Sequence, residues 1–404
     1  MVTTRGEQML ALRRARMAAA PPFLRGGFRP FFFGGAAWAV IALALWVLAL
    51  AGEIALPTAF DPLSWHRHEM LFGFVGAVIA GFLLTAIPNW TGRLPIAGPP
   101  LAMLFGLWLA ARLAVFCSGR LGVGVAAALD VGFFLVLAGV AGREVFAAKN
   151  RNTPLVGMVL LLGVANATDH AGAAGLIADL DLGVRGAIAL IVLMISLIGG
   201  RIIPSFTRNW LQKQGISGRM PTQPGRFDLV VIAASAAALV GWVAAPETVP
   251  IGVLLVVAGL LQAVRLARWS GLRAAHDPLV LVLHVGYAWV PAGLLLLGAS
   301  MIGESLPRSA AIHGLTAGAM GTMILAVMTR STLGHTGREL KANAQTVLIY
   351  ALVTLGALLR VAAPLELMDY MVGMELAAVA WAGSFLVFLA VYGPILFRPR
   401  VGEA

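Results

Sequence analysis

The sequence predicts an all-α polytopic membrane protein with twelve transmembrane helices and both termini in the cytoplasm. Of its 404 residues, 60% are hydrophobic and only 12% are charged, and the mean hydropathy is +0.89. A soluble protein of this composition would have to cover its surface with apolar side chains. The apolar residues are also gathered into runs of about 20, the length that crosses a ~30 Å hydrocarbon core. These observations exclude a soluble enzyme and leave no room for a folded extramembrane domain.

The predicted helices are apolar runs bounded by charged residues or by Pro and Gly. In chain order they cover residues 30–52, 67–88, 100–117, 121–142, 154–175, 184–206, 228–245, 250–267, 278–300, 309–330, 343–363 and 372–397. With the N-terminus inside, most of the 29 Lys and Arg residues fall on cytoplasmic segments, as the positive-inside rule requires. The opposite loops hold Arg67, Arg112, Arg120, Arg185, Arg308 and Arg360. Topology therefore accounts for the net charge of +11, and no nucleic-acid partner is expected.

Residues 1–27 are rich in Arg and Ala and predict a basic cytoplasmic arm. The apolar run behind them has full spanning length, so we expect a retained first helix and not a cleaved signal peptide. Clustered arginines ahead of a first helix orient it, and that role needs no binding partner. Residues 28–404 are predicted to form a single transmembrane domain.

Three equally spaced prolines, Pro30, Pro154 and Pro278, begin the first, fifth and ninth predicted helices. They predict three four-helix repeats, at about residues 30–150, 154–275 and 278–398. The alternative is coincidence, because proline is common in the first turn of any helix. Similar cytoplasmic ends of the second, sixth and tenth helices favour the repeats. In such a bundle, a polar site is expected where repeats meet.

Several classes of site are excluded by what the sequence lacks. Its single cysteine, Cys117, excludes an intrachain disulfide, a Cys-rich zinc site and a thiolate-held iron–sulfur cluster. The sequence also contains no Walker motif, no G-x-G-x-x-G after a strand and no H-E-x-x-H. ATP-driven transport is therefore not expected.

Four of the seven histidines are expected near the outer surface, on the second, fifth and tenth predicted helices. They are His66, His68, His170 and His313. Neutral imidazole can ligate iron, copper or zinc, and a carboxylate on its other ring nitrogen orients it. Glu69 and Asp169 are candidates for that supporting role. The clustering at one depth predicts a metal or haem site.

His66 and His68 are two residues apart, so on a helix they point in different directions and cannot both bind one metal, unless the helix begins after them. One of them is expected to ligate a haem between the second and tenth helices, with His313 on the other face. The other would join His170 at a second metal such as copper. The alternatives are interfacial side chains at residues 66 and 68, and a plain helix–helix hydrogen bond from His170.

Three further polar residues lie within the predicted helices. Arg201 is placed either to snorkel to the cytoplasmic surface or to bind a haem propionate or another anion. His284 is a weaker ligand candidate, because a polar packing pair with Tyr287 one turn away explains it as well. Asp130 has no evident partner, and protonation, a proton path or a pair across the bundle all fit it.

Several strings of residues carry a family resemblance. They are FRPFF at 28–32, WHRHEMLFG at 65–73, PNWTGR at 88–93, GRIIPSFT at 200–207, HGLTAGAM at 313–320, MTR at 328–330 and LGHTGR at 333–338. With these strings the sequence resembles the NnrS family from about residue 22 to the C-terminus. The resemblance implies a multi-pass protein of the bacterial inner membrane that contains haem, of b type, and copper. It also implies a role in denitrification and in the response to nitric oxide and nitrosative stress.

Together with the outer histidines, the resemblance leads us to expect redox chemistry or gas binding at those histidines. With no periplasmic domain to dock a soluble donor, a quinol or a small periplasmic protein fits as the electron donor. The arrangement is similar to haem–copper oxidases and nitric oxide reductases. However, the chain lacks their adjacent His-His pair and their paired histidines late in the sequence. A membrane oxidoreductase and a gas-binding sensor therefore both fit. The alternative from another class is a transporter of copper, haem or a nitrosyl-iron species, whose repeats rock about a midplane site.

Overall fold

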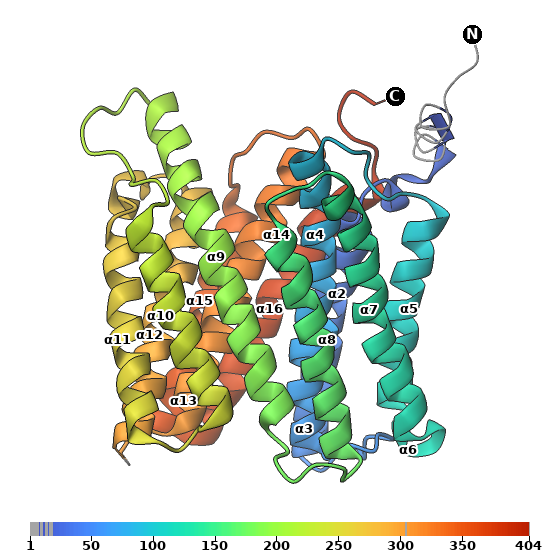
Figure 1. Ribbon diagram of the computed structural model, residues 1–404, viewed down its shortest axis with the longest axis vertical. Coiled ribbons are helices and arrows are strands. Elements are labelled where there is room, and N and C mark those ends of the chain that lie inside the picture. The colour runs from blue at the N-terminus through green and yellow to red at the C-terminus, as the bar shows by residue number, and fades with distance from the viewer. Residues whose placement is uncertain (1–7, 9–10, 13–14, 16–18, 304, 404) are drawn as a thin grey trace. The chain divides into compact units, whose positions relative to one another are not determined.

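The computed structural model describes residues 8, 11–12, 15, 19–303 and 305–403. These residues form helices and no strand, and twelve helical segments are long and apolar enough to cross a membrane (Figure 1). The segments are α2 (Phe28–Leu50), α3 to α4 (Pro62–Thr91), α5 (Pro99–Phe116), α7 (Val123–Ala147), α8 (Thr153–Ala173), α9 (Leu182–Lys213), α10 (Arg226–Ala244), α11 (Val249–Ala267), α12 (Pro278–Ile302), α13 to α14 (Arg308–His335), α15 and its last turn (Ala344–Leu365), and α16 (Tyr370–Phe397).

Each of the twelve predicted spans is confirmed, although α9 continues to Lys213. The predicted N-terminal arm lies partly outside the described residues. The six arginines expected in outer loops require a correction, because each lies on a helix. They are Arg67 on α3, Arg112 on α5, Arg120 on α6 (Ser118–Leu121), Arg185 on α9, Arg308 on α13 and Arg360 on α15. The orientation of the termini and the three repeats stay predictions.

The starts of the helices follow from local chemistry. Pro30, Pro154 and Pro278 lie in the first turns of α2, α8 and α12, where the missing N–H is not needed. Asp61 caps α3 (Pro62–His68), and its carboxylate accepts the backbone N–H groups of Leu63 and Ser64, each at 3.0 Å. This cap sets where the second spanning segment begins and therefore where its histidines lie.

Two spanning segments change to a π-helix directly after a histidine. The segment η2 (Glu69–Val75) follows His68, and η4 (Gly314–Met320) follows His313. After them, the chain returns to α-helix in α4 (Gly76–Thr91) and α14 (Gly321–His335). π-helical turns are rare in proteins, and those that occur are often found at functional sites. These two histidines therefore lie where the backbone changes from α-helix to π-helix.

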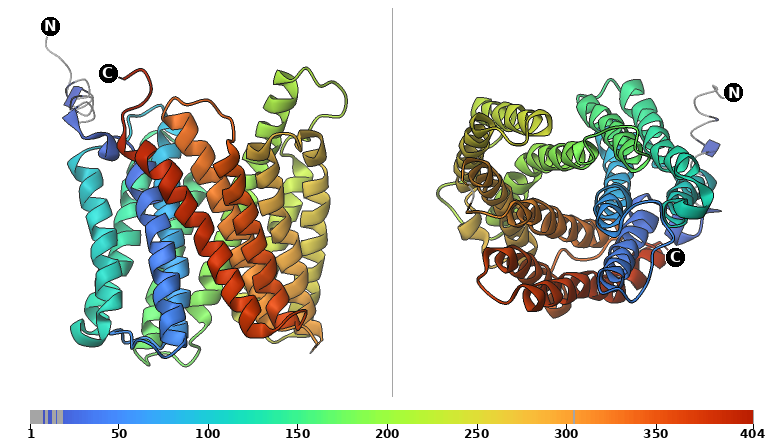
Figure 2. Two further views of the ribbon diagram at one scale, coloured as in Figure 1. Left: turned by 180° about the vertical axis from the view of Figure 1, so that it is seen from behind. Right: turned by 90° about the horizontal axis from the view of Figure 1, so that it is seen from below.

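The chain divides into two compact units. Unit 1 comprises residues 1–187, 331–338 and 389–404, and unit 2 comprises residues 188–330 and 339–388. In unit 1, α2 packs against α4, and α7 packs against both α5 and α8 (Figure 1). In unit 2, α11 packs against α10 and α12, and α12 packs against α13 (Arg308–His313) and η4 (Figure 2).

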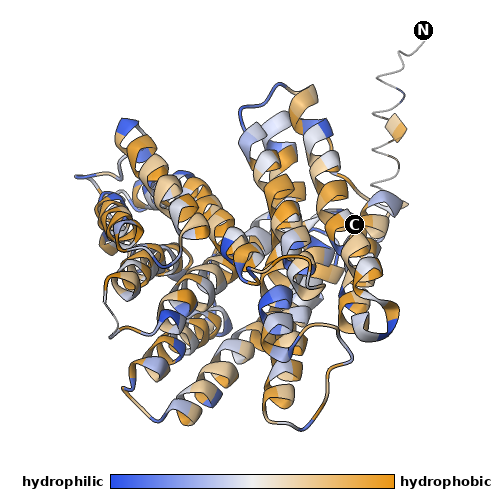
Figure 3. Ribbon diagram, turned by 60° about the horizontal axis from the view of Figure 1, so that its bottom comes forward, coloured by the Kyte–Doolittle hydropathy of each residue, from blue (hydrophilic) through white to orange (hydrophobic). Residues whose placement is uncertain are grey.

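The surfaces of the helices are apolar where a bilayer would touch them. Leu109, Leu135 and Val164 in unit 1, and Leu260 in unit 2, are large hydrophobic side chains that are exposed. Hydrophobic residues run along the helices, and many of the hydrophilic ones lie at helix ends and in the connections (Figure 3). This distribution is typical of helices that contact lipid. A helix satisfies its own backbone polar groups, so only its side chains meet the lipid, and apolar side chains do so without cost.

Arg29 explains one part of the string at residues 28–32. Its side chain is buried, and its Nη1 donates to the carbonyl oxygens of Leu396 at 2.8 Å and Arg398 at 2.7 Å. The last carbonyls of a helix have no partner within the helix, and a cation there also interacts favourably with the helix dipole. Arg29 therefore joins the start of α2 to the end of α16 within unit 1.

Candidate metal centre

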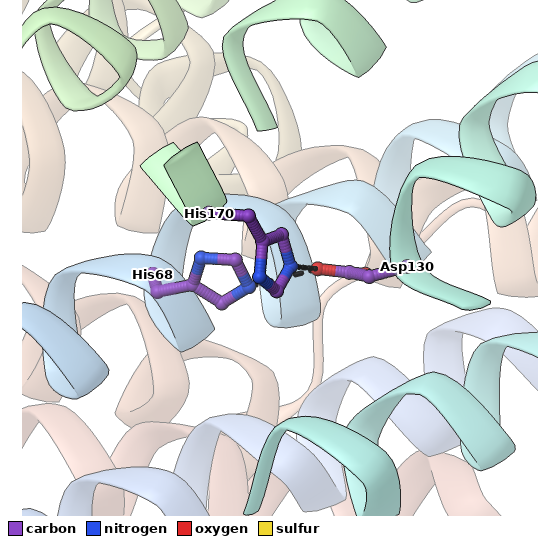
Figure 4. A group of neighbouring side chains, drawn as sticks. All are labelled: His68, Asp130 and His170. Carbon is purple, nitrogen blue, oxygen red and sulfur yellow. Dashed lines mark hydrogen bonds and ion pairs between the residues drawn. The ribbon is translucent and has the colours of Figure 1, made fainter. Parts of the chain in front are cut away.

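Three helices of unit 1 bring two histidines and an aspartate together. His68 is the last residue of α3, Asp130 lies on α7, and His170 lies near the end of α8. Their candidate ligand atoms all lie within 4.8 Å of one another, and all three side chains are buried. Both imidazoles point toward the carboxylate of Asp130 (Figure 4).

One oxygen of Asp130 is the centre of this group. Oδ2 lies 2.8 Å from His68 Nε2 and 3.2 Å from His170 Nε2. It also accepts a hydrogen bond from Asn166 Nδ2 at 2.7 Å. Two imidazoles and an amide thus converge on a single carboxylate oxygen.

His68 contacts a carboxylate at each ring nitrogen. Its Nδ1 lies 2.7 Å from Asp169 Oδ2, and its Nε2 faces Asp130. A neutral imidazole has one N–H donor, so one of these contacts requires a further proton or a metal ion between the two lone pairs. A carboxylate on the outer nitrogen is the usual support of a metal-ligating histidine. Asp169 holds that position.

A buried arginine lies behind the group. Arg112 of α5 is fully buried, and its Nη1 donates to Glu69 Oε2 at 2.6 Å, while its Nη2 donates to Asp130 Oδ1. Glu69 Oε2 also accepts the indole N–H of Trp38 at 2.5 Å. The carboxylate of Asp130 is therefore held by Arg112 at one oxygen and by the histidines at the other.

The charges in this buried group do not balance. It contains the carboxylates of Glu69, Asp130 and Asp169, and Arg112 is the guanidinium that forms ion pairs with two of them. With neutral imidazoles, three negative charges and one positive charge leave a net charge of −2. Uncompensated charge is costly in a low-dielectric interior. A divalent cation, or two protons, would neutralise the group.

Polar atoms of the group remain unpaired, and aromatic rings cover it. His170 Nδ1, Glu69 Oε1 and Asn166 Oδ1 are buried and have no hydrogen-bond partner in the described part of the chain. The ring of Phe60 lies 4.9 Å from that of His68 and 5.5 Å from that of His170. The donor set of two imidazoles, one carboxylate and an orienting carboxylate fits a metal ion.

The structure brings some of the site residues predicted from the sequence together and places others elsewhere. His68, His170 and Asp169 come together, and Asp169 supports His68 on another helix rather than its own neighbour. Glu69 supports Arg112 and not a histidine. The ring of His66 stacks on Trp46 at 4.1 Å.

Two central residues were not identified as site residues from the sequence. Asp130 had no evident partner, and Arg112 was expected in a loop. The signal that could have found them is their depth. Arg112 lies four residues before the end of α5, and Asp130 lies seven residues after the start of α7, so in an antiparallel pair they meet at one level.

The remaining candidates lie in unit 2. His313 Nδ1 lies 2.7 Å from the carbonyl oxygen of Ser309, which accepts its N–H and leaves the lone pair on Nε2. Arg201 is exposed on α9. The imidazole Nε2 of His284 lies 2.9 Å from Thr207 Oγ1.

Tyr287 does not form the expected pair with His284. Its hydroxyl belongs to another polar network in unit 2. Tyr287 donates its phenol to Gln262 Oε1 at 2.6 Å and accepts from Arg265 Nη1 at 3.0 Å. Arg265 also donates to Asp228 Oδ1 at 2.7 Å. This buried network pairs its charges, unlike the group in unit 1.

A family model described as NnrS protein matches residues 22–400, nearly the whole chain. No curated protein matches the sequence.

Proposed function

Because the chain belongs to the NnrS family, we propose that it is a haem- and copper-binding protein of the bacterial inner membrane that acts in nitric oxide metabolism. The observation that carries the proposal is the buried group of His68, Asp130 and His170. The twelve spanning helices support the membrane location. Within this proposal, the protein acts by redox chemistry or by gas binding at the histidine site.

Copper is the metal that we assign to the group in unit 1. Imidazole is a good ligand for copper, and His68 Nε2, His170 Nε2 and Asp130 Oδ2 are the atoms that would hold it. With neutral imidazoles the group has a net charge of −2, which one divalent ion would neutralise. When bound, copper would supply a redox-active centre. Asp169 holds the Nδ1 proton of His68, and Phe60 excludes water from the imidazoles.

Haem is assigned to other histidines. Both ring nitrogens of His68 face carboxylates, so we place His68 at the copper site. In unit 2, His313 is the haem-ligand candidate, because its Nδ1–H is held by Ser309 and its Nε2 keeps a lone pair. Arg201 is the candidate partner of a propionate in the same unit, and His66 in unit 1 is a further haem-ligand candidate.

The test is the metal content and optical spectrum of the full chain, purified in detergent from cells supplied with haem and copper. His68→Ala, His170→Ala and Asp130→Asn are expected to lose copper and keep the haem spectrum, whereas His313→Ala is expected to lose haem absorbance. His276→Ala is the matched control, because His276 is exposed in a loop. Addition of nitric oxide to reduced protein is expected to shift the spectrum.

Two results would overturn the proposal. Protein that contains neither copper nor haem under these conditions contradicts it and favours the transporter. Copper that remains at the wild-type level in all three unit 1 variants removes the assignment of the site.

A further inference from the structure

We propose that Arg112 is a positioning residue that holds one oxygen of Asp130 away from the two histidines, and so makes Asp130 a one-oxygen ligand. The inference rests on the metal site proposed above. It concerns a residue that does not touch the metal position and acts through Asp130.

Arg112 and the two histidines contact different oxygens of the Asp130 carboxylate. Its Nη2 donates to Asp130 Oδ1, and no imidazole contacts that oxygen in the described residues. Oδ2 is left for His68 at 2.8 Å and His170 at 3.2 Å. A partial rotation of the carboxylate would turn both oxygens toward the imidazoles, and the ion pair of Oδ1 with Arg112 opposes that rotation.

Arg112 is itself held. Its Nη1 donates to Glu69 Oε2 at 2.6 Å, and Trp38 fixes the same oxygen from α2 at 2.5 Å. Glu69 directly follows His68 and begins η2. A Cβ built on Gly73 would collide with Glu69 Oε2 and lie 2.8 Å from Arg112 Nη1, so the space around the pair is full.

The arrangement requires arginine. A guanidinium presents N–H donors in a rigid planar fork and can reach two carboxylates at once. A lysine ammonium carries the same charge on one nitrogen and cannot keep both directions. Arg112→Lys therefore preserves the charge of the group and removes the geometry.

A positioning role and a purely electrostatic role of Arg112 can be told apart by the effect of its removal on metal binding. A positive charge near a metal ion repels it, so a purely electrostatic Arg112 would weaken metal binding. Its removal in Arg112→Gln would then tighten binding. If Arg112 positions Asp130, the same variant weakens binding. The two roles predict opposite signs for the change in Kd.

The experiment uses the full chain in detergent, with Cu(II) as the probe, and measures Kd by titration and the ligand field by electron paramagnetic resonance. Wild type is expected to bind one Cu(II) that is lost in His68→Ala. Arg112→Lys and Arg112→Gln are each expected to raise Kd by ~10–100-fold and to change the spectrum.

The matched control is Arg265→Lys. Arg265 is also a buried arginine paired with an aspartate, Asp228, but it lies in unit 2. It is expected to keep the wild-type Kd and spectrum. If the Arg112 variants do not fold, Trp38→Phe removes one hydrogen bond from Glu69 and is expected to raise Kd by a few fold.

The outcomes are distinct. A wild-type Kd and spectrum in the Arg112 variants, or in Trp38→Phe where they do not fold, overturn the inference and leave the copper site standing. A lower Kd in Arg112→Gln also overturns it, because Arg112 then acts by charge alone. If wild type binds no Cu(II) that depends on His68, the proposed site fails and takes the inference with it.

Discussion

Gly73→Ala tests how closely the buried group of unit 1 is packed. The added Cβ would collide with Glu69 Oε2 and lie 2.8 Å from Arg112 Nη1 and 2.9 Å from Trp38 Nε1. A side chain must shift, and because Glu69 Oε2 is the nearest atom, we expect Glu69 to lose its ion pair with Arg112 and its bond to Trp38. Loss of a buried ion pair costs about 3–5 kcal/mol. The gain in helix propensity from Gly to Ala is about 1 kcal/mol, so we expect a net loss of roughly 2–4 kcal/mol.

The assay is thermal unfolding of the purified chain, followed by circular dichroism. Gly73→Ala is expected to unfold ~2–5 °C below wild type. Gly132→Ala on α7 is the control, because a Cβ built there meets no heavy atom of the described residues within 4 Å. It is expected to be as stable as wild type or slightly more so. A Gly73→Ala chain as stable as Gly132→Ala would refute the packing described around Glu69.

Further predictions concern other contacts of unit 1. Asp169→Asn removes the carboxylate that orients His68 and is expected to raise the Kd for Cu(II) by ~10–100-fold, whereas an unchanged titration contradicts that role. Arg29→Ala removes the cation at the end of α16 and is expected to cost about 2–3 kcal/mol in thermal unfolding, and a loss below half of that would show that water replaces it. Hydrogen bonding from Arg185 lowers the pKa of Asp179, so this pair stabilises the fold above the unfolded-state pKa and its contribution is lost as the pH falls through the folded-state pKa. Because Asp179 is exposed, we expect Arg185→Gln to alter the pH-dependent part of the free energy of unfolding by no more than ~0.5 kcal/mol. A larger alteration of that part contradicts this.

The fold was predictable because its signals are local. Spanning length and hydropathy depend on about 20 consecutive residues, and all twelve spans follow from them. The π-helical segments after His68 and His313 were not predictable. Gly73, Gly314 and Gly318 weaken a regular helix, but glycine also occurs within regular spanning helices such as α7, so the departure depends on packing that no local pattern reports.

The candidate site was predictable in part. His68, His170 and Asp169 could be named because imidazoles and carboxylates within a spanning helix are costly and therefore informative. Arg112 was assigned to a loop because charge usually marks the end of a span. Its burial is possible only through carboxylates on η2 and α7, which are distant in the sequence.

The most direct test of the central claim is X-ray absorption at the copper edge of the purified, copper-loaded chain. The buried group of His68, Asp130 and His170 predicts nitrogen and oxygen ligands with the scattering pattern of two imidazoles. His170→Ala is expected to reduce that pattern to one imidazole or to remove the copper. A spectrum with sulfur ligands, or one that His170→Ala leaves unchanged, would contradict the account.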